Sequence, residues 1–246
     1  MIIEGAHVVT VSGAEYPDGH VVVEGNRIVS VGSGPAPRPR NDGTRNDGTG
    51  DDTVVDARGC LLTPGFVNTH HHLYQWVTRG LAVDSTLFEW LTTLYPVWAG
   101  IDEHAVHTGA TGALARLALT GCTTSTDHHY VFPREGGDLL GAEILAASQV
   151  GLRFHPTRGS MDLGRSKGGL PPDSVVEDID AILTATEAAI DRWHDPAPDA
   201  MLQIGVAPCS PFSVTSELMI EAAALARRKG VRLHTHLAET DDEEAF

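Results

Sequence analysis

The first part of the chain carries apolar runs of strand length that are rich in β-branched residues. Residues 1–32 predict two strands, from the runs VVTV and HVVVEGNRIVSVG, and Gly25–Asn26 predicts a tight turn. The Gly, Pro and Asp content of residues 33–52 predicts a mobile surface loop, after which TVVDARGCLLTPG resumes the strand pattern. Residues 1–63 are therefore expected to form a small β-sandwich segment.

From Pro64 onward, short apolar strands alternate with segments of helical period. Strands are predicted at 65–68, 122–129, 152–159, 202–208 and 231–239, and helices at 104–120, 138–150, 175–193 and 216–229. Asp102 and Ser216 are expected N-caps, and Gly230 is expected to end the last helix. This alternation is typical of a parallel α/β fold. A doubly wound sheet also fits, although no GxGxxG motif follows the first strand.

Polar residues gather where each predicted strand of this second part ends. They are His70 to His72, Asp127 to His129, Arg158, Cys209 to Ser210, and His234 to Glu239. A barrel with its site on one rim shows this asymmetry. Residues 64–246 are therefore expected to be the first five β/α units of a (β/α)8 TIM-type barrel. The barrel is expected to be incomplete, because a closed one takes roughly 250 residues.

Two histidine pairs suggest a metal site at these strand ends. His70 and His72 are two residues apart, so on a strand their side chains share one face and can bind one divalent ion at ~2.0–2.1 Å. A solvent-exposed polar strand end is the alternative. His234 and His236 repeat the spacing, and Glu239 follows. We interpret His234 as a core histidine, and His236 with Glu239 as functional, because a hydrolytic metal site needs a carboxylate that moves protons.

Composition narrows the range of partners. The formal net charge of −16 argues against a protein that binds nucleic acid or anionic lipid, and no apolar run is long enough to span a bilayer. The N-terminus has no basic segment of a signal peptide. Cys60, Cys122 and Cys209 are far apart, so no disulfide framework is expected. These features predict a cytoplasmic protein that binds neither nucleic acid nor a membrane.

Several motifs occur together between residues 60 and 240. They include NTHHHLYQ, GCTTSTDHHY, LRFHPTRGSM, GRSKGGLPPD, VAPCSPFSV and HTHLAE. As a set they resemble the amidohydrolase superfamily, in its mononuclear deaminase and chlorohydrolase branch, and most of all the enzymes that deaminate 8-oxoguanine. The resemblance implies a (β/α)8 barrel with a β-sandwich built from both chain ends. It also implies that His70, His72 and His236 bind the metal and that Glu239 is the proton shuttle.

The resemblance also bears on the number of metal ions. Binuclear relatives bridge two ions with a carboxylated lysine at a strand end, and neither Lys167 nor Lys229 lies at one. We therefore expect one divalent ion, zinc in preference to iron. A further histidine and a metal-binding aspartate of the family would follow residue 246, so we do not expect this chain alone to be active.

The expected function is the hydrolytic deamination of a purine-like heterocycle, with 8-oxoguanine converted to urate and ammonia. An s-triazine or pterin aminohydrolase or chlorohydrolase of the same fold is the alternative. A truncated, non-catalytic chain that binds a metal or a partner is the second alternative. A homo-oligomer is possible, as in relatives of this kind.

Three residues are candidate substrate contacts, each with a structural alternative. Gln75 can pair with the amide edge of a purine, or can be a polar residue at a helix start. Arg158 can meet a ring carbonyl or an anion, or can form a surface ion pair. His128 can contact substrate or cap its strand. The aromatic segment from Trp90 to Trp98 can form a lid over the heterocycle, although packing is the favoured interpretation.

Overall fold

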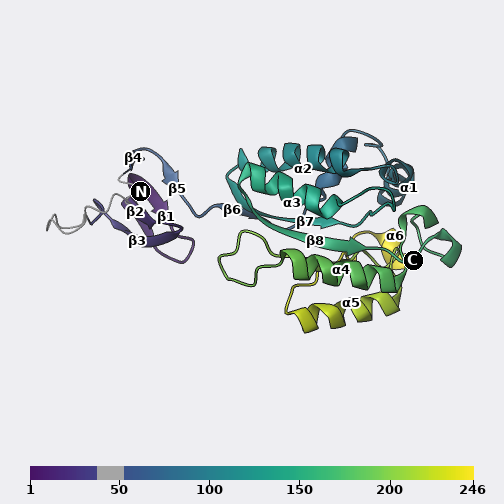
Figure 1. Ribbon diagram of the computed structural model, residues 1–246. Helices are drawn as coiled ribbons and strands as arrows, with labels where there is room; N and C mark the ends of the chain where they lie inside the picture. The colour runs from purple at the N-terminus through teal and green to yellow at the C-terminus, as the bar shows by residue number, and fades with distance from the viewer. Residues whose placement is uncertain (38–52) are drawn as a thin grey trace. The chain divides into compact units, whose positions relative to one another are not determined.

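The computed structural model describes residues 1–37 and 53–246. The predicted mobile loop at 33–52 lies, except for its first five positions, outside the described residues. The described chain forms two compact units, Met1–Gly65 and Phe66–Phe246, which are drawn in Figure 1. Each unit is described by itself below.

The N-terminal unit is one sheet with the strand order β3-β2-β1-β4, and β5 also pairs with β1. Its strands are β1 (Ile2–Val9), β2 (Glu15–Glu24), β3 (Arg27–Ser33), β4 (Val54–Asp56) and β5 (Leu61–Leu62). The second apolar run of the sequence folds as the β2–β3 hairpin, with its turn at Gly25, where φ is +58°. The described residues of this unit supply a single sheet, so they do not include a facing sheet that would complete a β-sandwich.

The C-terminal unit is built on a parallel sheet whose strands follow one another in chain order (Figure 1). The strands are β6 (Phe66–Asn68), β7 (Cys122–His129), β8 (Arg153–Ser160) and β9 (Gly205–Pro208). Helices α2 (Glu103–Ala118), α3 (Leu139–Val150), α4 (Ile179–Trp193) and α5 (Ser216–Lys229) alternate with these strands. Sequential parallel strands that alternate with helices form a half-barrel of the TIM type.

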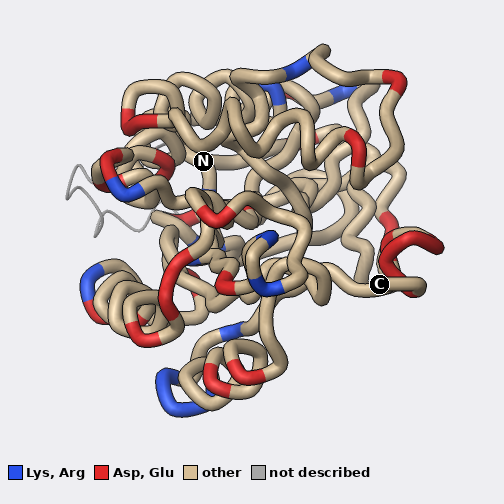
Figure 2. The backbone as a smooth tube through the Cα atoms, turned by 90° about the vertical axis from the view of Figure 1, so that its right-hand side faces the viewer, with Lys and Arg blue, Asp and Glu red and all other residues tan. Residues whose placement is uncertain are grey.

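Further helical elements lie outside this alternation of strands and helices. They are η1 (Leu73–Thr78), α1 (Leu87–Trp98), η2 (Arg165–Lys167), η3 (Asp173–Val175) and α6 (Asp241–Ala245). None of the helices in the described ranges combines the length and the apolar composition that crossing a bilayer requires. Acidic and basic residues are spread over the helices, and α6 carries an acidic run near the C-terminal end (Figure 2).

Two apolar clusters hold the C-terminal unit together. One contains residues of all four helices α2 to α5 with Phe154 and Val206 of the strands, which places these helices against the sheet. The other is centred on α1 and includes Tyr95 and Trp98, both fully buried. The aromatic segment is thus part of the core, as the packing interpretation predicted. Trp90 is partly exposed, and Trp90 and Tyr95 both line a cavity.

Three predictions about element boundaries were wrong for local reasons. The helix predicted from 175 begins at Ile179, because the side chain of Asp178 caps it by accepting from Asp180 N–H. Thr215, not Ser216, caps α5, since its hydroxyl accepts from Leu218 N–H at 3.1 Å.

The strand predicted at 231–239 is the third difference. This segment follows β9 and forms only an isolated bridge between Val206 and Leu233. Its hydrogen bonds run from Val206 N–H to Arg232 O, from His234 N–H to Val206 O and from His236 N–H to Cys209 O. Between the last two bonds the donors advance by two residues and the acceptors by three, so the register shifts and the ladder does not continue beyond the bridge.

Candidate metal centre

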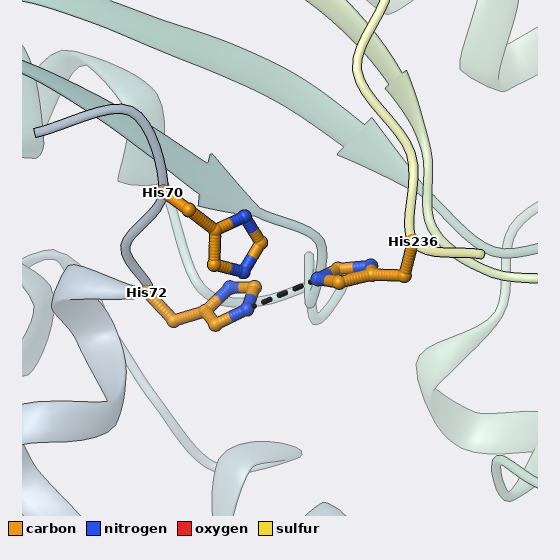
Figure 3. Close-up of side chains that lie close together, drawn as sticks. All are labelled: His70, His72 and His236. Atoms are coloured by element: carbon orange, nitrogen blue, oxygen red, sulfur yellow. Dashed lines mark hydrogen bonds between the residues drawn. The ribbon is translucent and has the colours of Figure 1, made fainter. Parts of the chain in front are cut away.

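Three imidazoles meet at the carboxyl-terminal edge of the parallel sheet. His70 and His72 follow β6, and His236 lies on the segment that follows β9 and α5. One nitrogen from each ring lies within 4.8 Å of the others, as Figure 3 shows. The parallel sheet produces this meeting, because the carboxyl ends of all its strands lie along one edge.

Backbone carbonyls fix the tautomers of two of these rings. His72 Nδ1 is 2.7 Å from His128 O, and His236 Nδ1 is 2.7 Å from Cys209 O. A carbonyl oxygen only accepts, so Nδ1 must be the donor in both rings. Burial lowers the pKa of both histidines, so the rings are neutral and each Nε2 presents a bare lone pair.

These two lone pairs face each other across 3.2 Å between His72 Nε2 and His236 Nε2. Neither nitrogen has a proton to share, so the contact is repulsive unless a cation lies between them. With bonds of about 2.1 Å, this separation corresponds to an angle of roughly 100° at a shared ion, close to tetrahedral. The donor set therefore fits one divalent cation.

His70 contacts His234, which we interpreted from the sequence as a core histidine. His70 Nδ1 lies 3.1 Å from His234 Nε2, and the two ring centroids are 5.1 Å apart. His234 is half-buried, so its interpretation as a core histidine was wrong. A hydrogen bond from His70 Nδ1 to His234 leaves His70 Nε2 free for a metal, in the same way as carbonyl partners do for the other two rings.

A cavity of about 190 Å³ opens beside the three histidines. It is lined by His70, His72, Gln75, Leu87, Trp90, Leu91, Tyr95, Tyr130, Cys209, Ser210, Phe212, His236 and Glu239. Such a combination of apolar and polar side chains is typical of a small-molecule site. The Cys209 thiol is buried, and burial raises its pKa to about 12, which leaves it a neutral side chain rather than a nucleophile.

Glu239 lines this cavity on a turn that Glu243 holds in place. The Glu243 carboxylate accepts from Ala238 N–H at 3.1 Å and from Glu239 N–H at 2.8 Å. Ala238 adopts a left-handed φ of +54°, which turns the chain between His236 and Glu239. Burial, and then the charge of Glu243, raise the pKa of Glu239. The sequence analysis missed Glu243, whose only signal was an acidic residue four positions after Glu239.

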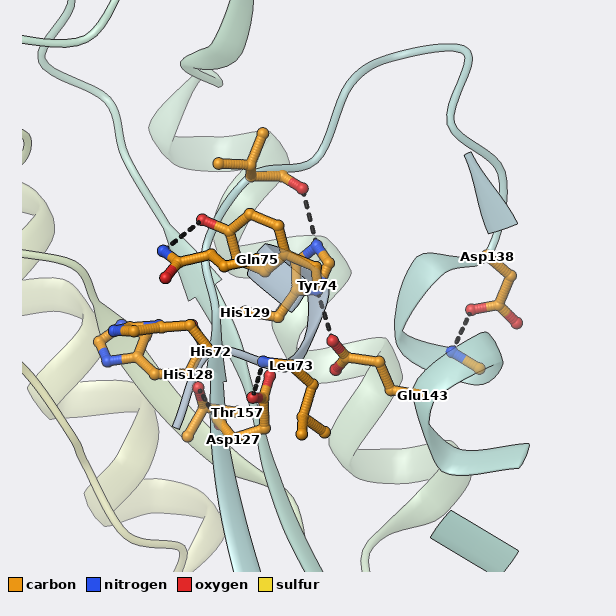
Figure 4. Close-up of polar contacts among 12 residues, drawn as sticks. His72, Leu73, Tyr74, Gln75, Asp127, His128, His129, Asp138, Glu143 and Thr157 are labelled. Carbon is orange, nitrogen blue, oxygen red and sulfur yellow. Dashed lines mark hydrogen bonds and ion pairs between the residues drawn. The ribbon is translucent and has the colours of Figure 1, made fainter. Parts of the chain in front are cut away.

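The three predicted substrate residues lie in different surroundings. Gln75 lines the cavity, and its Nε2 donates to Tyr130 Oη at 3.1 Å. His128 is fully buried and stacked on His236, with ring centroids 4.4 Å apart. Figure 4 draws its side chain, and neither of its ring nitrogens has a partner among the described residues.

Arg158 lies elsewhere, although it was predicted beside these residues. Both of its terminal nitrogens bind Glu177, each at 2.7 Å, and its guanidinium lies 3.9 Å from the ring centroid of Phe132. It is not among the residues that line the cavity. The structure thus gathers His70, His72, His236, Glu239 and Gln75 around one cavity, with His128 against them, and leaves Arg158 outside.

Comparisons with known proteins agree with this architecture. A family model described as "Amidohydrolase family" matches residues 61–245. An 8-oxoguanine deaminase of Pseudomonas aeruginosa is 43% identical over 241 residues, which are 97% of this chain and 51% of that protein. A hydroxydechloroatrazine ethylaminohydrolase of Pseudomonas sp. (strain ADP) is 42% identical over 76% of this chain and 40% of its own length. The chain thus spans about half the length of these curated relatives, or less.

A solved structure is similar over nearly the whole chain. The atrazine chlorohydrolase of Arthrobacter aurescens TC1, in complex with zinc, superimposes with a TM-score of 0.86 at 31% identity. The match covers 96% of this chain and 52% of that one. The parallel sheet and its helices are therefore the same fold as part of that hydrolase.

Proposed function

This chain belongs to the amidohydrolase family, and on that premise we propose that His70, His72 and His236 bind one divalent metal ion for hydrolytic deamination. Zinc is the proposed ion, because imidazole nitrogens suit it and a similar hydrolase was solved with zinc. The observation that carries the proposal is the 3.2 Å separation of His72 Nε2 and His236 Nε2, while the Nδ1 of each ring is held by a backbone carbonyl. When bound, the ion supplies a hydroxide nucleophile at neutral pH by lowering the pKa of water.

The chain's own residues would handle the protons and the substrate. Glu239 lines the cavity next to the ligands, and its raised pKa suits a group that accepts a proton from water and returns it to a ring nitrogen. The side chains of Trp90 and Phe212 line the same cavity and present flat apolar surface to a heterocycle. Gln75, held by Tyr130, presents an amide that can pair with the amide edge of a purine.

His128 and Arg158 are proposed as substrate contacts, each only if the substrate can reach it. Both nitrogens of His128 lack partners among the described residues, so a ligand that reaches the ring can bind either one. Arg158 reaches a substrate only if its ion pair with Glu177 opens.

We propose 8-oxoguanine as the substrate, released as urate and ammonia, since the 8-oxoguanine deaminase is 43% identical to this chain. The alternative is the hydrolysis of a triazine with a different leaving group. It is supported by the similarity of the chain to a hydroxydechloroatrazine ethylaminohydrolase and an atrazine chlorohydrolase. A cytoplasmic location is part of the proposal, supported by the free thiols of all three cysteines.

Zinc binding by the 246-residue chain tests the site directly. Competition with a chromophoric chelator should give one zinc per chain, and His236→Ala should weaken binding by more than about tenfold. The matched control is His104→Ala, an exposed histidine on α2, which should leave binding unchanged. Equal affinity of His236→Ala and the wild type would refute the proposed ligand set.

Ammonia release from the zinc-loaded chain tests the reaction. The panel contains 8-oxoguanine, isoxanthopterin and amino- or chloro-triazines, with chloride release measured for the last. Turnover of 8-oxoguanine alone supports the main proposal, and turnover of a triazine or a pterin alone replaces it. Turnover of any of these compounds at one bound zinc would reject the second alternative, a non-catalytic metal-binding chain.

A further inference from the structure

A second cluster of ionisable groups lies behind the candidate metal centre and takes no part in it. Asp127 and His129 belong to the end of β7, and Glu143 belongs to α3. All three side chains are fully buried, and one polar atom from each lies within 4.8 Å of the others (Figure 4). Buried ionisable groups need partners or a shared proton, because an isolated buried charge is strongly disfavoured.

Hydrogen bonds connect this cluster to the backbone at Leu73 and at Val131. Asp127 Oδ1 accepts from Leu73 N–H at 2.6 Å, and Leu73 directly follows His72. His129 Nδ1 lies 2.7 Å from Glu143 Oε1, and His129 Nε2 lies 2.8 Å from Val131 O. Two buried atoms, Asp127 Oδ2 and Glu143 Oε2, have no donor among the described residues.

The acceptors fix where the protons are. Val131 O only accepts, so His129 Nε2 carries a hydrogen. A neutral ring then has a bare Nδ1, which needs a donor, and a protonated Glu143 Oε1 supplies it. The Glu143 Oε2 that remains is a carbonyl oxygen, and it can accept from a protonated Asp127 Oδ2. Both orphaned atoms are then satisfied, and Asp127 Oδ1 still accepts from Leu73.

An ion pair between His129 and Glu143 is the competing arrangement. Arg158 of β8, whose charge also lowers the pKa of His129, is already paired with Glu177. Burial raises the pKa of Glu143 to about 8 and lowers that of His129 to about 4, and it holds the pKa of Asp127 well above its usual range. All three directions favour the neutral forms at pH 7.

We propose that Asp127, Glu143 and His129 form a neutral, hydrogen-bonded chain of positioning residues that holds His72 in its metal-binding orientation. The chain fixes Leu73 N–H on one side of His72, while His128 O, from the same strand end, fixes the ring through Nδ1. At its other end it fixes Val131, next to Tyr130, which holds Gln75. The role assigned to His72 rests on the proposed function.

Replacement of Glu143 by glutamine or leucine tests whether the three residues form neutral hydrogen bonds or an ion pair between His129 and Glu143. In Glu143→Gln the new side chain can accept from Asp127 through its carbonyl and donate to His129 through its amide, so this variant should keep zinc affinity within about threefold. Glu143→Leu removes both contacts and should weaken zinc binding by about 10–100-fold, as for other groups that orient metal ligands. Asp127→Asn preserves both contacts in the same way and should also retain affinity.

The ring of His129 provides a readout that a merely structural role would not move. ¹⁵N chemical shifts should show a neutral ring with hydrogen on Nε2 at pH 7, in the wild type and in Glu143→Gln. An imidazolium signal in the wild type, or a Glu143→Gln variant that binds zinc as weakly as Glu143→Leu, would overturn the proposal. Two zinc ions per wild-type chain and one in Glu143→Gln would also overturn it, since the cluster would then be a second metal site.

Failure of the proposed metal centre can be distinguished from failure of the proposed hydrogen-bonded chain. If the wild type binds no zinc, the metal centre is refuted, whereas the tautomer of His129 still tests the hydrogen bonds among Asp127, Glu143 and His129. If Glu143→Leu does not fold, the affinities of Glu143→Gln and Asp127→Asn carry the comparison.

Discussion

Glu143→Gln should abolish a loss of stability that the wild type suffers as pH rises. The Glu143 side chain is fully buried, and burial raises its pKa to about 8 from an ordinary value of 4.5. A carboxyl with a raised pKa in the folded state favours its protonated form there. Its contribution to the free energy of unfolding is therefore complete below the unfolded pKa and is lost as pH rises through the folded pKa.

The size of the effect follows from these two values. By pH 6 the unfolded chain has released the Glu143 proton, while the folded chain keeps it until about pH 8. Each pH unit between these limits removes about 1.36 kcal/mol. The two pH units from pH 6 to pH 8 give roughly 3 kcal/mol, less a fraction of a kcal/mol because Glu143 is half ionised in the folded chain at pH 8. The wild type should thus lose about 2 kcal/mol relative to Glu143→Gln. The histidines titrate in both proteins, so they cancel in the difference.

Urea unfolding at half-unit pH intervals, with a chelator present to remove zinc, measures this difference. The two proteins should diverge steadily from pH 6 and level off above pH 8. A difference that is flat, or that favours the wild type increasingly as pH rises, would refute the reasoning. Glu143 would then be ionised in the folded state and paired with an imidazolium.

Three further predictions concern the site and its scaffold. Burial lowers the pKa of each of the three candidate ligands, so protons should compete with zinc for them only in acid solution. Zinc affinity measured by chelator competition should therefore stay nearly constant from pH 8 to pH 7 and fall below pH 7. A steady fall from pH 8 would contradict this. Gly159→Ala should lower the free energy of unfolding in urea by about 1–3 kcal/mol, because a Cβ there would collide with His129 O, whereas Gly112→Ala, with its nearest neighbour at 3.9 Å, should be neutral or stabilising. Asp102→Ala should destabilise by about 1 kcal/mol in the same assay, because α2 loses the cap on Ala105 N–H, and no change would remove Asp102 from that role.

The pattern of the sequence was enough for the general arrangement of the site. The alternation of strands with helices predicted that polar strand ends would meet at one edge. His70 and His72 were expected on one face of a strand, which was wrong, because β6 ends at Asn68 and both residues lie in the loop that follows it. The family resemblance is confirmed by the match over residues 61–245. These features are local or repeat along the chain, so single-sequence reasoning can detect them.

The remaining features depend on contacts between distant segments. His234 was placed in the core because nothing in HTHLAE shows that it would face His70, 164 residues away in sequence. Arg158 was predicted at the site from its place at a strand end, but Glu177 on a later loop binds its guanidinium. The Asp127–Glu143 neighbourhood likewise requires the packing of α3 on β7, which periodicity does not reveal.

Three consecutive residues at the end of β7 serve two separate environments. His128 stacks against the candidate ligand His236, whereas Asp127 and His129 contact Glu143 from α3. A strand alternates its side chains, so a deletion or insertion of one residue earlier in β7 would turn Asp127 and His129 toward His236 and the His128 ring toward α3. The length of this strand is therefore under the same functional constraint as the identity of its last residues, and relatives that share the site should vary in the loops on either side of β7 rather than within it.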